Sequence, residues 1–328
     1  MKLLFSYLCV SVFICGLILL PGCDKPSAES VTIYTSVDQP VAEPILKAFE
    51  AKTGIKVQAR YDTEANKSVG LAERLRAEKD HPQADVWWGN EIFLTINLAN
   101  DGVLAAYDSP SAADIPAKFK DPQHRWAASG MRVRVIASNG SASVTGLDIL
   151  TDPKFKNKLA MARPVAGTTT GHVAALYATW GEAKADAYLK ALHDNGIKLV
   201  GGNSIVADGV KSGQFIVGLT DNDDADAAGV NAVLPDQSGI GTLAIPCTVS
   251  TVAGRDSSAA RLLADYLLSK EVEQQLIAAK FVKYTVRAGP GEIRTMDVDY
   301  AKAAAILPQV TRRATAILEG RTEEIDHR

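Results

Sequence analysis

The sequence contains few of the residues on which disulfide-stabilised scaffolds and histidine-based enzymes depend. It has four cysteines and five histidines among 328 residues. Three cysteines lie within the first 23 residues, so only Cys247 remains in the body of the chain, and we interpret it as a buried strand residue. The histidines form no cluster, and the sequence has no Gly-x-Ser-x-Gly, His-Glu-x-x-His or P-loop motif. We therefore expect a protein that is not an enzyme.

The chain also lacks a strong charge of either sign. Its 35 Lys and Arg residues and 38 Asp and Glu residues give a net charge of −3, and no basic cluster predicts nucleic-acid binding. Hydrophobic residues make up 47% of the chain, which is ordinary for a globular protein. Because the length exceeds the usual size of a single hydrophobic core, we expect two domains or two lobes.

The first 23 residues predict where the protein works. Lys2 precedes an apolar run over residues 3–20, which ends at Pro21-Gly22-Cys23. The run is short for a membrane span and is typical of a secretory signal peptide. It resembles a bacterial lipoprotein signal over residues 1–22, with Cys23 acylated and residues 23–30 as a polar tether. The alternative is an uncleaved anchor. We expect an exported protein, lipid-anchored on the periplasmic side of a bacterial membrane.

Predicted strands and helices alternate along the chain. Residues 31–35 predict a strand, residues 41–53 have helical spacing, and residues 55–61 predict a second strand. Such a βαβ unit requires parallel strands. The pattern continues with strands at 84–88, 131–138, 198–200 and 215–219, and with helices at 69–79, 91–100, 172–180, 182–194, 205–212 and 257–269. The sequence therefore predicts an α/β protein whose ligand binds beyond the carboxyl ends of its strands.

One expected ligand loop, residues 164–171, is rich in threonine and leads into a helix. The backbone N–H groups and hydroxyls of its central residues predict an anion site at a helix N-terminus, formed by Gly167, Thr168, Thr169 and Thr170. The alternative is that the threonines only cap the helix. On the strand at 131–138, Arg132 or Arg134 offers a guanidinium to an oxyanion; alternatively, these arginines pair with acids between the lobes.

A second expected loop carries four carboxylates within six residues, at Asp221, Asp223, Asp224 and Asp226. Carboxylates are ligands for hard cations such as Ca²⁺, Mg²⁺ or ferric ion, although such a run is also typical of a solvated turn or helix cap. Anion-binding groups on one side and carboxylates on the other favour a zwitterion. A suitable ligand is 2-aminoethylphosphonate, with its phosphonate on the threonine loop and its ammonium against Asp223 and Asp224.

Four segments together resemble the periplasmic solute-binding proteins of bacterial ABC importers, extracellular solute-binding protein family 1. They are residues 31–57, 84–91, 129–135 and 213–224, and they are most similar to the ferric-ion-binding branch. The resemblance implies a type II periplasmic-binding-protein fold, in which each lobe is a mainly parallel sheet flanked by helices. Hinge strands near 129–136 and 243–252 would join the lobes, which close on the ligand. The implied N-terminal lobe comprises 31–130 and 245–297, and the C-terminal lobe 131–244 and 298–328.

The resemblance also implies partners and a ligand. The chain would be the non-catalytic, monomeric component of an ABC importer, delivering its small ligand to a permease and an ATPase; a sensor role is an alternative. The implied cargo is ferric iron with a synergistic anion, and no resident cofactor is expected. The family's iron ligands are a histidine, a glutamate and a tyrosine pair, and the matching positions here are Asp38, Asn90, Asp223 and Asp224.

Replacement of both phenolates argues against the family's iron chemistry, because phenolate oxygen is well suited to ferric ion. The family's anion loop also uses an asparagine that matches Asn203. We predict a ligand site formed by Asp38, Asn90, Glu91, Arg132, Gly167, Thr168, Thr169, Thr170, Asn203, Asp223 and Asp224. Within it, we predict Asp38, Asp223 and Asp224 as metal ligands.

Overall fold

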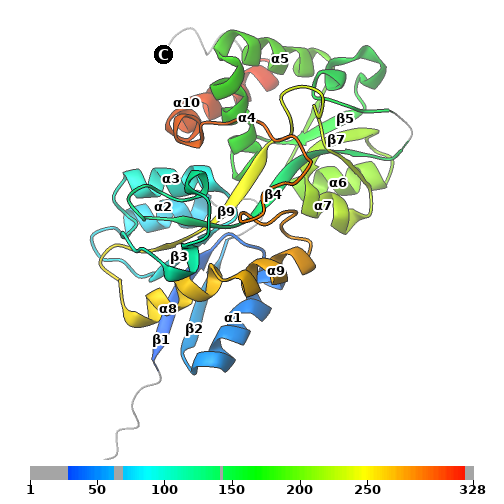
Figure 1. The fold of residues 1–328 in the computed structure, drawn as a ribbon. Helices are drawn as coiled ribbons and strands as arrows, with labels where there is room; N and C mark the ends of the chain where they lie inside the picture. Colours follow the sequence, from blue (N-terminus) through cyan, green and yellow to red (C-terminus); the bar gives the residue numbers. More distant parts are fainter. Residues whose placement is uncertain (1–28, 63–68, 141–142, 322–328) are drawn as a thin grey trace, which may run out of the picture.

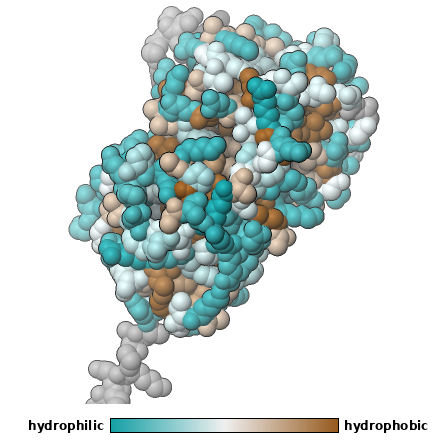
Figure 2. Space-filling model, in the orientation of Figure 1, coloured by the Kyte–Doolittle hydropathy of each residue, from teal (hydrophilic) through white to brown (hydrophobic). Residues whose placement is uncertain are grey.

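The computed structural model describes residues 29–62, 69–140 and 143–321, which form two α/β lobes (Figure 1). The predicted signal, the predicted acylation site at Cys23 and most of the predicted tether lie outside these residues. No helix within the described ranges is long and apolar enough to span a bilayer. In Figure 2, hydrophilic residues cover most of the visible face of both lobes, and hydrophobic residues form small separate patches.

The lower lobe in Figure 1 begins with the βαβ unit that the sequence predicted. It contains β1 (Ser30–Thr35), α1 (Gln39–Thr53), β2 (Lys56–Tyr61), α2 (Val69–Ala77), β3 (Val86–Gly89) and α3 (Ile92–Asn100). Strand β1 pairs in parallel with β2 and β3. Helix α1 buries Ile45, Leu46 and Phe49 and ends at Gly54, whose φ of 75° is the left-handed conformation that glycine favours. Helices α8 (Ser258–Leu267) and α9 (Lys270–Ala278) pack in the same lobe.

The upper lobe repeats this architecture. Its elements are β5 (Leu159–Ala162), α4 (Gly167–Trp180), α5 (Glu182–Asp194), β6 (Lys198–Val200), α6 (Asn203–Lys211), β7 (Val217–Asp221), α7 (Asn222–Ala228), β8 (Asn231–Val233) and α10 (Tyr300–Leu318). Strand β5 pairs in parallel with β6 and β7. Each lobe is therefore built on a parallel core.

Two long strands, β4 (Ala127–Ser138) and β9 (Ala244–Thr251), connect the lobes. The first part of β4 pairs with β9, and its second part, from Arg134, pairs with β7. The described strands form one continuous sheet in the order β2-β1-β3-β9-β4-β7-β5-β6, with β8 also paired to β4. This confirms the predicted two-lobed α/β fold with crossing strands. The exact lobe boundaries given above stay a prediction.

The hydrophobic core lies on both faces of the sheet. Trp87 and Trp88 are adjacent on β3 and therefore face opposite sides of the sheet, so each packs into a different hydrophobic cluster. Trp87 also donates from Nε1 to Thr95 Oγ1 at 2.8 Å. Cys247 is buried in β9, as predicted, and burial raises the pKa of its thiol to about 12.

Three local expectations differ from the structure. Helix α4 begins at Gly167 and not at residue 172, so the threonine loop is the first turn of the helix. The acidic run is not a loop: Asp221 ends β7, and the following residues form α7. The sequence also gave no indication of β5, because Leu-Ala-Met-Ala is short and contains no β-branched residue.

Candidate functional site

The N-termini of α4 and α6, both in the upper lobe, meet at one small pocket. Their N-cap residues, Ala166 and Gly202, provide no side-chain cap for the first-turn N–H groups. The pocket has a volume of about 40 Å³, and both N-termini contribute to its wall together with Asn90, Arg132, Asp221 and Asp224. Uncapped N–H groups and the positive ends of two helix dipoles therefore face the same space.

The threonine and asparagine side chains around this pocket bond to one another. Thr168 Oγ1 donates to Asp221 Oδ2, and Thr169 Oγ1 donates to Asn203 Oδ1 at 3.0 Å. Asn203 Nδ2 donates to Thr168 Oγ1 at 2.9 Å and to Asp221 Oδ2 at 3.1 Å. These bonds tie α4 to α6 and to the end of β7. The side chains thus position the two helix ends around the pocket.

Arg134 lies beneath this network and is completely buried. Its Nη1 donates to Asp221 Oδ1 at 2.7 Å and to Asn203 Oδ1 at 3.1 Å. Burial raises the pKa of Asp221, but Arg132 and Arg134 outweigh this effect and hold that pKa below its usual range. Asp221 is therefore a structural anion between two guanidinium groups.

Arg132 is 2% exposed and lies among three carboxylates. Its Nη2 is 2.7 Å from Asp223 Oδ2, 3.0 Å from Asp221 Oδ2 and 3.9 Å from Asp224 Oδ2. The guanidinium also stacks 5.0 Å from the ring centre of Phe281. Both arginines therefore pair with acids, as the alternative predicted. These acids lie on β7 and α7, next to the second half of β4, and the pairing does not cross between the lobes.

The acids form a compact group at the junction of β7 and α7. Oxygens of Asp221, Asp223 and Asp224 lie within 4.8 Å of one another. Burial raises the pKa of Asp223, and Arg132 offsets only part of this effect. Asp38, the N-cap of α1 in the lower lobe, is close enough to raise that pKa further. The structure thus places Asp221, Asp223 and Asp224 around Arg132, with Asp38 close to Asp223.

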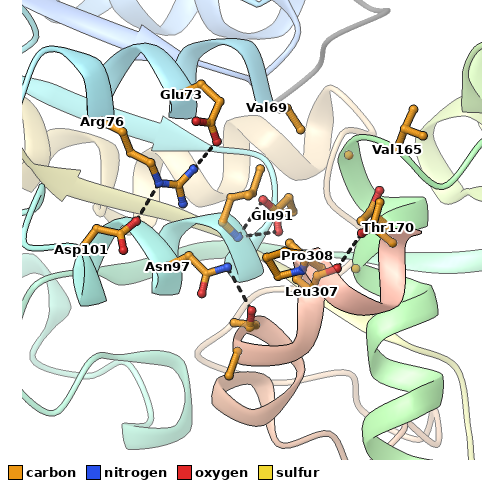
Figure 3. A pocket seen from close by; sticks show the side chains of 16 residues that line it. Val69, Glu73, Arg76, Glu91, Asn97, Asp101, Val165, Thr170, Leu307 and Pro308 are labelled. Atoms are coloured by element: carbon orange, nitrogen blue, oxygen red, sulfur yellow. Dashed lines mark hydrogen bonds and ion pairs between the residues drawn. The ribbon is translucent and has the colours of Figure 1, made fainter. Parts of the chain in front are cut away.

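Asn90 and Glu91 are neighbours in sequence but line different spaces. The Asn90 side chain accepts a hydrogen bond from Ser36 Oγ at 3.1 Å and lines the pocket at α4 and α6. Glu91 caps α3 by accepting from the Phe93 N–H at 2.6 Å and the Leu94 N–H at 3.1 Å. Burial raises the pKa of Glu91 to about 7. Glu91 and Thr170 line a second pocket, shown in Figure 3.

Sequence reasoning missed two parts of this region. It predicted Asn203 in the site and a helix from residue 205, but it did not recognise that the N-terminus of α6 lines the same pocket as that of α4, although Gly201-Gly202 before the helix was a usable signal. It also missed the second pocket. That pocket is formed by helices that are far apart in the sequence, so no local motif indicates it.

Two α/β lobes, crossing strands and a polar site bounded by loops of both lobes define a two-lobed solute-binding protein. The chain belongs to the bacterial extracellular solute-binding protein family, whose sequence profile matches residues 31–281. Members of this family bind solutes and are not enzymes.

Comparison with individual proteins agrees with this assignment. The chain is 24% identical over 327 residues to an uncharacterized protein of Haemophilus influenzae, and the match covers 90% of each chain. It is 26% identical over 208 residues to the major ferric iron-binding protein of Neisseria meningitidis, but this match spans only 60% of each chain. The predicted similarity to the ferric-ion-binding branch is confirmed.

A solved structure extends the likeness over nearly the whole fold. The periplasmic binding protein AfuA from Actinobacillus pleuropneumoniae, with exogenous fructose-6-phosphate bound, matches with a TM-score of 0.76 and 24% identity. The match covers 92% of this chain and 100% of that structure. It supports the two-lobed periplasmic-binding-protein fold.

Proposed function

We propose that the chain is the lipid-anchored binding component of an ABC importer, which captures a small ligand on the periplasmic side and delivers it to a permease and an ATPase. The family assignment and the amino-terminal sequence pattern support this proposal. The ligand contacts both lobes only when they are closed, and it thereby stabilises the closed state. The protein acts as a monomer.

The ligand carries an oxyanion, which binds at the N-termini of α4 and α6. The observation that carries this proposal is that neither helix has a side-chain cap and that both line one pocket. Oxyanions such as phosphate and phosphonate bind well at this kind of site, because several backbone N–H groups and the helix dipoles stabilise the negative charge. Thr168, Thr169 and Asn203 hold the two helix ends together.

The ligand also carries a positive charge. The acidic group offers three carboxylates, Asp221, Asp223 and Asp224, to the two guanidinium groups of Arg132 and Arg134. These carboxylates lie next to the oxyanion pocket, where they favour a ligand that carries an ammonium group as well as an oxyanion, that is, a zwitterion. We propose 2-aminoethylphosphonate, with its ammonium group facing Asp223, Asp224 and Asp38.

Ferric ion with a synergistic anion is the second candidate. It is favoured by the three carboxylates within 4.8 Å of one another and by the Neisseria meningitidis relative, which is a ferric iron-binding protein. Two observations count against it. Arg132 already lies between these carboxylates, and no tyrosine is among the described residues that line the pocket. A metal ion would have to displace the guanidinium without gaining a phenolate.

Titration calorimetry distinguishes the candidates. The purified protein is titrated separately with 2-aminoethylphosphonate, inorganic phosphate, and ferric citrate plus phosphate. The proposal predicts binding of 2-aminoethylphosphonate without metal and weaker binding of phosphate. Binding only in the presence of iron would refute the zwitterion and support the second candidate.

A further inference from the structure

The second pocket is large and lies between elements of both lobes. It has a volume of about 560 Å³ and is lined by α2, α3, the first turn of α4, and α10 (Figure 3). This volume is in the range of sites that bind small organic molecules. Its wall is apolar in large part, with contributions from Val69, Leu94, Val165, Leu307 and Pro308.

The polar side chains of this pocket include a group of ion pairs and a hydroxyl without a partner. Arg76 lies between Glu73, at 2.5 Å, and Asp101, at 2.7 Å, so the charges of α2 and α3 are paired with each other (Figure 3). Thr170 is 6% exposed, and its Oγ1 has no hydrogen-bond partner among the described residues. A buried hydroxyl without a partner is costly. Because Thr170 lines the pocket, a ligand that reaches this hydroxyl would satisfy it.

The first turn of α4 separates the two pockets and touches both. Thr168 and Thr169 line the oxyanion pocket, whereas Thr170 and Gly171 line the second pocket. Gly167, at the tip of the helix, lines both, as does Val165 before it. An oxyanion held at this tip therefore has its substituent next to the opening of the second pocket. The oxyanion pocket, at about 40 Å³, has no room for a large substituent.

We propose that the second pocket is a subsite for the organic substituent of a phosphate monoester or phosphonate. The site would then accept such ligands in addition to the small zwitterion proposed above. This inference rests on the proposed oxyanion site. The substituent passes Gly167, packs against Leu94 and Leu307, and bonds to Thr170 Oγ1. Because the wall includes both lobes, a ligand that fills this subsite also stabilises one arrangement of the lobes.

The test compares a ligand with an apolar substituent and one without. Phenyl phosphate and 2-aminoethylphosphonate are titrated into the wild-type protein and into Ala305→Trp. Ala305 is an exposed residue of α10 that lines the second pocket, so an indole there fills the pocket without entering the core. Leu262→Trp is the matched control, because Leu262 is exposed on α8, in the lower lobe and away from both pockets.

The expected result is that Ala305→Trp weakens phenyl phosphate binding by at least about tenfold, as expected when an aromatic ring is no longer buried. The same variant leaves 2-aminoethylphosphonate binding unchanged, and Leu262→Trp changes neither. Thr170→Val, which removes the hydroxyl and keeps the shape, weakens a phosphate ester with a hydroxylated substituent, glycerol 3-phosphate, more than phenyl phosphate.

Two outcomes overturn the subsite. One is that 2-aminoethylphosphonate binds while phenyl phosphate does not. The other is that Ala305→Trp affects phenyl phosphate no more than Leu262→Trp does. If no oxyanion binds to the wild-type protein, the proposed function and the subsite are both wrong. The two outcomes above refute the subsite alone, so the two failures can be told apart.

Discussion

Replacing Ala166 by Asp should separate the stability of α4 from its ability to bind an anion. Ala166 is the N-cap of α4, with φ −154° and ψ 162°, and its side chain accepts no hydrogen bond. Asp is favoured at such a position because its carboxylate accepts hydrogen bonds from the first-turn N–H groups. We expect the free energy of unfolding to rise by about 1 kcal/mol, the typical difference between Ala and Asp at an N-cap.

The same carboxylate would occupy the place of the ligand's oxyanion. Two negative charges about 4 Å apart repel each other by about 4 kcal/mol at an effective dielectric constant of about 20. That energy corresponds to about a thousandfold change in affinity. Since salt screens part of the repulsion, we expect Ala166→Asp to weaken 2-aminoethylphosphonate binding at least about a hundredfold.

Urea unfolding gives the stability of this variant, and calorimetry gives its affinity. The control is Ser257→Asp, which adds a carboxylate at the N-cap of α8, where Ser257 Oγ already accepts from the Ala260 N–H at 3.1 Å. This control should bind like the wild-type protein. The reasoning is refuted if Ala166→Asp keeps the wild-type affinity, or if it loses affinity only because the fold is destabilised.

Three further predictions concern buried groups around the cleft. Arg134→Met should lower the free energy of unfolding by about 3 to 5 kcal/mol because it leaves Asp221 partly unpaired in the interior. Lys190→Met, at an exposed ion pair, should lower it by less than about 0.5 kcal/mol. Equal effects of the two variants in urea unfolding would contradict this. Burial raises the pKa of Glu91 from 4.5 to about 7, so its ionisation disfavours the folded state as the pH rises through this range. Relative to Glu91→Gln, the wild-type protein should lose about 2 to 3 kcal/mol of unfolding free energy between about pH 5 and about pH 8, and parallel stability curves would exclude this effect. With its pKa raised to about 12, the buried Cys247 should resist a thiol reagent in the folded protein and react in urea, as peptide mass mapping would show; rapid labelling without urea would disagree.

The sequence predicted the alternation of strands and helices well because it depends on local periodicity. Apolar spacing located α1, and the β-branched run located β1. The start of α4 was placed too late because its first turn is made of threonines, which have low helix propensity. In the structure, Thr168 and Thr169 are stabilised there by Asp221 and Asn203, and these partners are distant in sequence.

The candidate site was predicted less completely than the fold, and the reason is also distance along the chain. The threonine loop, Asn203 and the acidic run were each identified from their own segments. Their mutual hydrogen bonds, and the pairing of Arg132 with acids about ninety positions away, depend on how β4 lies beside β7. The acidic run forms the start of α7 for a local reason, because negatively charged Asp side chains are favoured in the first turn of a helix.

The most direct test of the central claim is a crystal structure of the protein with 2-aminoethylphosphonate. The claim is that an oxyanion binds at the joined N-termini of α4 and α6. We predict that the phosphorus atom lies within hydrogen-bonding reach of the backbone N–H groups that begin at Gly167 and Asn203, with the ammonium group toward Asp223 and Asp224. A phosphonate bound away from both helix ends, or one held only through a metal ion at the carboxylates, would contradict the account.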